Sequence, residues 1–100
     1  MHEDYSILEN EILDFIKKLL AEHANDLKNL GIFSKIQEIR KETQPNYRSE
    51  LEVDFSDENG IFKVMEFFIY ENSKPSASKK EFEDWINDFF KDLLKGKPDY

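Results

Sequence analysis

Three carboxylates spaced two apart, Glu50, Glu52 and Asp54, are the residues of the chain best placed to do chemistry together. On a β-strand this spacing puts side chains on one face, so the three groups are expected to stand side by side. A catalytic acid needs burial to raise its pKa, whereas these carboxylates alternate with Leu51 and Val53, which predict the buried face. The row is therefore expected to point to water. Two interpretations stay open: a solvated face, or an acidic docking surface for a basic partner.

Other kinds of chemical site are not indicated by the sequence. The two histidines, His2 and His23, have no second ligand at metal-binding spacing, and the chain has no cysteine, the usual partner in structural zinc sites. No serine lies in a Gly-x-Ser-x-Gly turn, and the three glycines form no phosphate-binding loop. We therefore expect no enzyme activity, no cofactor and no bound metal.

The charge of the chain favours some partners over others. Its net charge is −8 over 100 residues, and such a field repels phosphate backbones and anionic membrane surfaces while favouring basic partners. The acidic start of the chain does not resemble a signal peptide, and no apolar run approaches the roughly 18 residues of a membrane helix. Together with the lack of cysteine, this predicts a cytoplasmic protein of one domain, residues 1–100.

Apolar residues recur at helical spacing at both ends of the chain. The first run begins at Ser6, for which Glu9 completes a predicted capping box. It continues for about 25 residues, long enough for a kink or break near Ala24-Asn25. The second run begins at Ser78, with Glu81 in the same role. Its apolar stripe consists of Phe82, Trp85, Ile86, Phe89, Phe90, Leu93 and Leu94, so two amphipathic helices are expected.

Three strands are expected between these helices. Residues 35–42 are the least distinct, because the apolar spacing there also fits a helix. Residues 50–55 alternate apolar and acidic, and Asn59-Gly60 is a strong hairpin signal. The third strand follows over residues 61–70. The predicted fold class is α+β, with the order α-β-β-β-α: a three-stranded antiparallel meander with two helices packed mainly on one face.

The third predicted strand is apolar on both faces. Pairing about Asn59-Gly60 puts Phe62, Val64 and Phe68 on the core face and leaves a second apolar row facing outward. Three explanations are open: the first helix or residues 24–34 wrap to that face, the face forms a homodimer, or it docks a different protein. The candidate protein interface comprises Met65, Phe67 and Ile69 of the outward row and the acidic Glu50, Glu52, Asp54, Asp57 and Glu58.

The order of elements is similar to that of double-stranded RNA-binding domains over roughly residues 6–95. Ser78-Lys79-Lys80-Glu81 resembles the start of their second helix, where lysines contact phosphates, and Pro45 stands where their loop commonly carries a proline. Bulky aromatic residues replace the alanines favoured in that helix, and the net charge is strongly negative. The resemblance implies an alternative function, nucleic-acid binding through Lys74, Lys79 and Lys80.

The favoured function is that of a small acidic protein-binding module without catalysis, which docks a basic or amphipathic protein. By size and charge it is analogous to immunity proteins and inhibitors that mask nucleases or toxins. Nucleic acid is a less favoured partner because of the charge, and a membrane is not expected. A structural homodimer is the remaining alternative.

Overall fold

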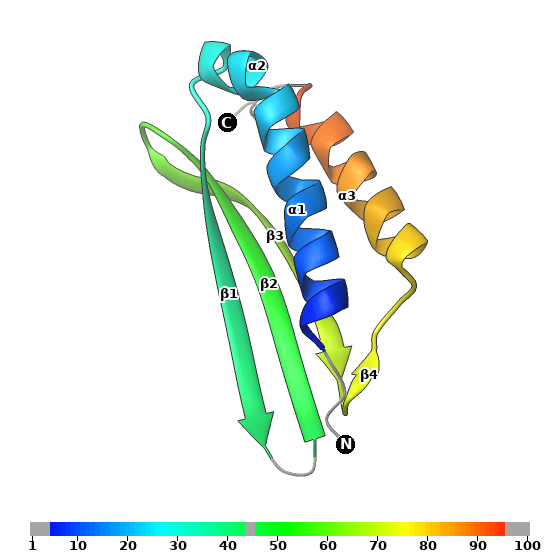
Figure 1. Cartoon of the computed structure of the whole chain (residues 1–100). Helices are drawn as coiled ribbons and strands as arrows, with labels where there is room; N and C mark the ends of the chain where they lie inside the picture. The colour runs from blue at the N-terminus through cyan, green and yellow to red at the C-terminus, as the bar shows by residue number, and fades with distance from the viewer. Residues whose placement is uncertain (1–4, 44–45, 96–100) are drawn as a thin grey trace.

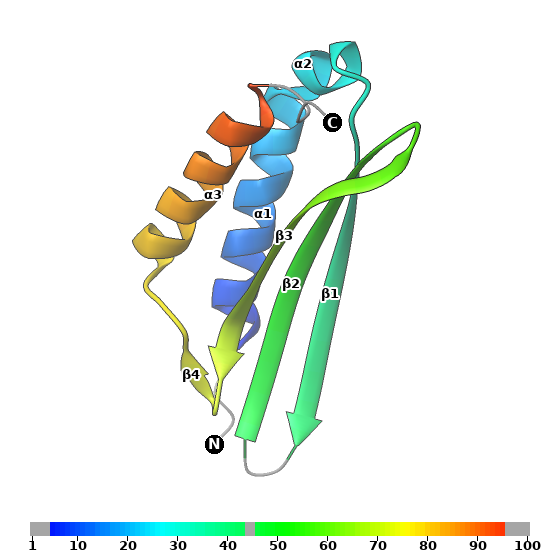
Figure 2. The same cartoon turned by 180° about the vertical axis from the view of Figure 1, so that it is seen from behind.

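The computed structural model describes residues 5–43 and 46–95 of the chain (Figures 1 and 2). Its helices are α1 (Ser6–Glu22), α2 (Ala24–Asn29) and α3 (Lys79–Leu93), and its strands are β1 (Phe33–Thr43), β2 (Asn46–Asp57), β3 (Gly60–Glu71) and β4 (Lys74–Pro75). The strands form one antiparallel sheet in the order β1-β2-β3-β4. The predicted α+β class and meander are confirmed, and the short strand β4 is an element that the sequence analysis does not predict.

The helices α1 and α3 lie side by side on one face of the sheet, and in the described part of the chain nothing covers the other face (Figure 2). Ile12 and Ile16 of α1 and Ile86 and Phe90 of α3 are buried against the sheet in one continuous core. The prediction of both helices on one face is therefore confirmed. The alternative in which the first helix wraps to the opposite face is wrong.

The N-terminal helical region differs from its prediction at its start. The residue that caps α1 is Tyr5, which makes no side-chain capping bond, so the predicted capping box of Ser6 and Glu9 does not form. The carboxylate of Glu9 is turned into the core, where it accepts a hydrogen bond of 2.6 Å from the hydroxyl of Tyr47. The helical run then breaks at His23, close to the break expected near residues 24–25.

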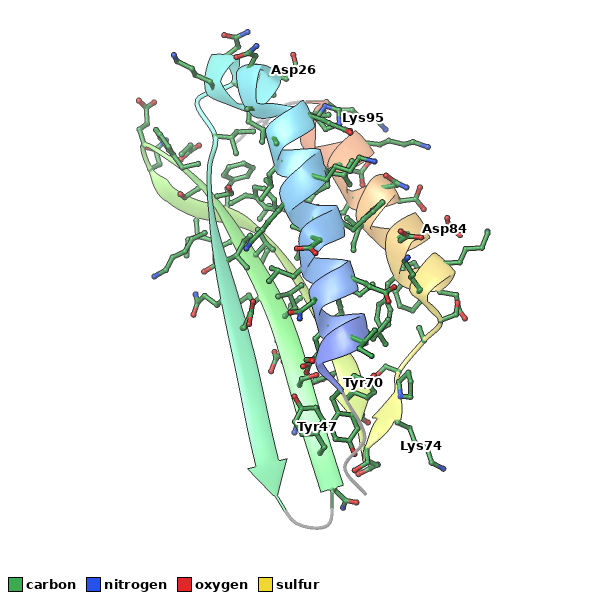
Figure 3. The ribbon with its side chains drawn as sticks, viewed as in Figure 1. Asp26, Tyr47, Tyr70, Lys74, Asp84 and Lys95 are labelled. Carbon is green, nitrogen blue, oxygen red and sulfur yellow. The ribbon has the colours of Figure 1, made fainter. Side chains whose placement is uncertain are left out.

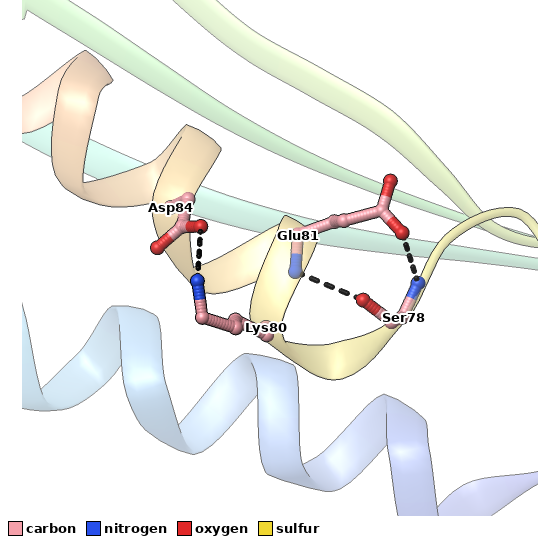
Figure 4. A network of polar contacts seen from close by, with 4 residues as sticks. All are labelled: Ser78, Lys80, Glu81 and Asp84. Atoms are coloured by element: carbon pink, nitrogen blue, oxygen red, sulfur yellow. Dashed lines mark hydrogen bonds and ion pairs between the residues drawn. The ribbon is translucent and has the colours of Figure 1, made fainter.

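The start of α3 agrees with its prediction. The hydroxyl of Ser78 accepts a hydrogen bond of 3.1 Å from the backbone N–H of Glu81. The Glu81 carboxylate in turn accepts one of 3.4 Å from the backbone N–H of Ser78 (Figure 4). Two N–H groups that the helix itself leaves without partners are thereby satisfied.

The turn between β2 and β3 lies one residue earlier than predicted. Asp57 pairs with Gly60, so that Glu58 and Asn59 form the turn, and the register shifts again near Phe55. Relative to the predicted pairing, the net displacement is one residue. Because successive strand residues point to opposite faces, a displacement of one residue exchanges the two faces of β3.

The exchange places the predicted outward row of β3 in the core. Met65 lies opposite Val53 and is 5% exposed, and Ile69 is 3% exposed. Phe67 is half-buried, with its ring centroid 5.4 Å from that of Phe82 on α3. The prediction that Met65, Phe67 and Ile69 face outward is therefore wrong. Both faces of β3 are largely apolar, so the apolar residues alone could not decide between the two registers.

Candidate protein-binding face

The uncovered face of the sheet carries four carboxylates on two neighbouring strands. Glu50, Glu52 and Asp54 alternate with the core residues of β2, as predicted, and Glu66 of β3 lies directly opposite Glu52. The expectation that the row points to water is wrong for Asp54, which is only 8% exposed. Gln37 of β1 joins them, because its Nε2 donates to Asp54 at 2.9 Å and to Glu52 at 3.3 Å. We call Glu50, Glu52, Asp54 and Glu66 the acidic cluster.

Crowding within the acidic cluster raises two pKa values above the ordinary 4.5. A side-chain hydrogen bond with Asp54 is the largest cause for Glu52, followed by desolvation and by the charges of Asp54 and Glu50. A hydrogen bond with Glu50, followed by the charge of Glu50, raises the pKa of Glu66. A hydrogen bond between two carboxyl groups requires a proton, so it favours the protonated form. The acidic cluster is thus held with its charges close together.

The lysines and arginines whose side chains the structure describes do little to neutralise the acidic cluster. In the part of the chain that the structure describes, none of the four carboxylates forms an ion pair within 4 Å with a lysine or arginine. Lys35 is the register partner of Asp54 on β1, yet it makes no such pair. Lys63 of β3 turns to the helical side, where its Nζ lies 4.9 Å from the centre of the Phe89 ring.

Apolar side chains border the acidic cluster. Val64 of β3 pairs with Asp54 and is 43% exposed. Toward the β2–β3 turn, Phe33 and Ile61 are exposed on either side of β2. At the other end, the guanidinium carbon of Arg48 lies 4.2 Å above the centre of the Phe68 ring. The uncovered face therefore combines negative charge with exposed apolar area.

The structure keeps part of the predicted interface together and separates the rest. Glu50, Glu52 and Asp54 lie on the uncovered face, whereas the three predicted apolar members, corrected above, belong to the helical face. Asp57 and Glu58 lie at the β2–β3 turn, where Asp57 Oδ1 accepts a hydrogen bond of 2.7 Å from the backbone N–H of Asn59. At about 3.3 Å per residue, that turn stands roughly 25 Å from Glu50.

Glu66 is the member of the acidic cluster that the sequence analysis missed. In the predicted register it belongs to the core face, where a carboxylate has no reason to be. That conflict was a signal in the sequence for a register displaced by one residue, which the bulge near Phe55 produces together with the earlier turn, and which places Glu66 beside Glu52.

The lysines of the alternative nucleic-acid site are distributed over two elements. Lys79 Nζ lies 3.1 Å from a carboxylate oxygen of Glu11 on α1, and this contact raises the pKa of Lys79. Lys80 Nζ lies 3.2 Å from Asp84 (Figure 4). Lys74 projects from β4, below the start of α3 (Figure 3). Two of the three ammonium groups are therefore already paired with carboxylates, and Pro45 lies outside the described residues.

The uncovered face has the features of a charged contact surface. Among the side chains that the structure describes, no group of three from His, Cys, Asp or Glu is placed to hold a metal ion. Within residues 5–43 and 46–95, no helix combines the length and the apolar character needed to cross a bilayer.

In comparisons with known proteins, no family model, curated protein or solved structure matches the chain.

Proposed function

We propose that the protein is a non-catalytic binding module that docks the basic surface of another protein on the uncovered face of its sheet. The observation that supports this most strongly is the acidic cluster, whose four carboxylates stand together without a lysine or arginine ion pair in the described part of the chain. Bringing cations to these carboxylates relieves their mutual repulsion, so a basic partner gains more there than at a single exposed ion pair.

The apolar border supports contact with a protein rather than with a free cation. Val64, Ile61 and Phe33 are exposed around the acidic cluster, and interfaces commonly combine apolar area with a charged part that steers association. The chain has no cysteine, which agrees with action in the reducing cytoplasm. Nucleic-acid binding is less well supported, because Lys79 and Lys80 are paired with Glu11 and Asp84.

The test compares two variants of equal net charge. The first is the triple reversal Glu50→Lys, Glu52→Lys and Asp54→Lys on the uncovered face. The second reverses the exposed helical residues Asp14, Glu22 and Asp26 to lysine. Partners captured from the native lysate by the wild-type protein are identified, and their association rates with each variant are measured over a range of salt concentrations.

We expect the first variant to lower the association rate at least 10-fold at low salt, because long-range charge mainly affects the on-rate. The helical variant is expected to retain the wild-type rate within about 3-fold. Thermal unfolding of each variant reports whether the fold is intact. Unchanged binding in the first variant, or equal losses in both, would refute the proposal.

A further inference from the structure

One long side of β3 is open. The strand pairs with β2 from Gly60 to Tyr70, but β4 covers its other side only at Tyr70 and Glu71. One more hydrogen bond, from the backbone N–H of Ser76 to the carbonyl of Ile69, extends that cover. Within the described residues, the backbone of residues 61–68 therefore has one side without a neighbouring strand, as is visible beside β4 in Figure 2.

A hollow of about 280 Å³ follows this open side and lies between β3 and α3. Four consecutive β3 residues line it, Val64 to Phe67, together with Trp85, Ile86 and Phe89 of α3. Successive strand residues point to opposite faces, so four in a row can line one hollow only if it runs along the strand edge itself. Trp85 stands beside the hollow with 51% of its surface exposed.

The composition of this edge distinguishes it from the edge formed by β1. From Ile61 to Ile69, only Lys63 and Glu66 are charged, whereas Lys35 and Glu38 are exposed charges on the first half of β1. A long apolar edge with open N–H and C=O groups is a template for pairing with another strand. The volume of the hollow is close to the roughly 300 Å³ at which small-molecule pockets begin, and its length along the strand edge favours an extended occupant. It suits one or two apolar side chains.

We propose that an extended segment of a basic protein partner adds to the sheet along β3, with its apolar side chains seated against Trp85 and Phe89. Strand addition supplies affinity through main-chain hydrogen bonds and specificity through alternate side chains. This inference rests on the proposed function and specifies how the partner is held. Glu66 is a member of the acidic cluster and Val64 borders it, and both residues also line the hollow. One partner can therefore contact the acidic cluster and the hollow together.

Two carboxylates and one cation, Lys63 over the Phe89 ring, lie beside the hollow, and this negative balance favours a basic strand over a second copy of this chain. Glu66 lies on β3, and the exposed Asp88 follows Trp85 by three residues on α3, which places it on the same side of the helix. Lysine or arginine at alternate positions of an added strand would lie on the side of Glu66, and the apolar residues between them would lie on the side of α3. A second copy would instead bring the same two acidic residues, on a chain of net charge −8, to a shared edge.

The experiment uses the full chain and three nine-residue peptides. The probe alternates lysine and valine. A second peptide carries the same side chains but a methyl group on every backbone nitrogen, which removes the donors, and a third replaces lysine by glutamate. Amide chemical shifts map the binding site, and hydrogen exchange reports protection along β3. Val64→Lys is the edge variant, and Ile7→Lys, at an exposed position on α1, is its matched control.

We expect the lysine–valine peptide to shift the amides of residues 61–68 and the Trp85 indole, and to slow exchange along that edge. Backbone methylation, glutamate in place of lysine, and Val64→Lys should each weaken binding at least 10-fold, while Ile7→Lys should change it less than 3-fold. Light scattering on the free chain at neutral pH should give the mass of a monomer.

Several outcomes would overturn the inference. Shifts confined to Glu50, Glu52 and Asp54 and insensitive to methylation would leave the proposed function standing and remove strand addition. Equal binding of the glutamate peptide would remove the basic preference. A dimer with a protected β3 edge in the absence of peptide would identify a second copy as the occupant. Absence of binding at millimolar peptide would contradict both the inference and the proposed function.

Discussion

At the scale of single residues, the buried pair Tyr47 and Glu9 connects the sheet to the first helix. The hydroxyl of Tyr47 donates to the Glu9 carboxylate at 2.6 Å, and both residues are buried. Hydrogen bonds to charged groups contribute about 1.5–3 kcal/mol. Tyr47→Phe is therefore expected to lower the free energy of unfolding by roughly 1–3 kcal/mol in urea denaturation.

The matched change on the other partner, Glu9→Gln, retains an oxygen that can accept the Tyr47 hydroxyl. We expect it to be less damaging than Tyr47→Phe. A Tyr47→Phe variant as stable as the wild-type protein would show that this hydrogen bond contributes little to stability.

The carboxyl groups of the acidic cluster provide a second prediction for single residues. The pKa values of Glu52 and Glu66 are raised above 4.5, chiefly by Asp54 and Glu50 respectively. Asp54→Asn is expected to lower the pKa of Glu52, and Glu50→Gln that of Glu66, each toward 4.5. Titration of the side-chain carboxyl carbons by NMR measures these shifts. If each substitution left its partner's pKa unchanged, the described contacts would not be their cause.

The same pKa shifts give a sign to the pH dependence of stability. A carboxyl group whose folded-state pKa exceeds its unfolded value binds its proton more readily in the folded protein. The favourable contribution of Glu52 and Glu66 is fully present below pH 4.5 and is lost as the pH rises through their raised pKa values. Neutralising Glu52 by Glu52→Gln should therefore reduce this loss of stability in denaturation curves measured from pH 4 to 7.

At the scale of elements, the sequence was sufficient for the type and order of the helices and long strands. Capping and apolar periodicity located α3 to within a residue, because Ser78 and Glu81 act locally. The start of α1 was predicted less well, since Glu9 is drawn to Tyr47, a residue 38 positions away. The residues next to Glu9 in the sequence cannot show that its carboxylate binds Tyr47 instead of capping α1.

The pairing of β2 with β3 marks the limit of sequence reasoning for this fold. The Asn59-Gly60 signal correctly located a hairpin but not its two turn residues, and a displacement of one residue reversed the predicted faces of β3. Because of this error, the predicted interface included Met65, which lies in the core, and left out Glu66, which lies on the uncovered face. The prediction put Glu50, Glu52 and Asp54 on the correct face because only one face of β2 is apolar, but it did not foresee that Asp54 is buried there.

The cap of α3 yields a prediction at this scale. Ser78→Ala removes the hydroxyl that accepts from the Glu81 backbone N–H. Loss of an N-cap residue typically lowers stability by about 1 kcal/mol, within a range of about 0.5–2. Urea denaturation of Ser78→Ala measures it, with the exposed Ser76→Ala as the control for the same chemical change nearby. Equal stability of the two variants would contradict a stabilising cap.

At the scale of the whole molecule, net charge and the open side of β3 act against each other. At neutral pH the charge of −8 keeps copies apart. Near the sequence pI of about 4.7 that repulsion is lost, and apolar edges can then pair. We expect light scattering to show a monomer at pH 7 and a concentration-dependent rise in mass near pH 4.7.

The edge variant provides the control for this self-association. Val64→Lys places a charge on the open side of β3 and should suppress the rise in mass near pH 4.7, whereas Ile7→Lys on α1 should not. If both variants assembled like the wild-type protein, the edge of β3 would not be the contact.

The aromatic cluster seen beside the start of α1 bears on the order of folding events. The rings of Tyr5 and Tyr47 stack with centroids 4.1 Å apart, and Tyr70 meets both edge-on (Figure 3). These tyrosines come from three segments that are far apart along the chain. Contacts of large sequence separation form late because their loops must close first. We therefore expect the near-ultraviolet signal of these rings to develop late in folding, when the start of α1 packs against β2 and β3.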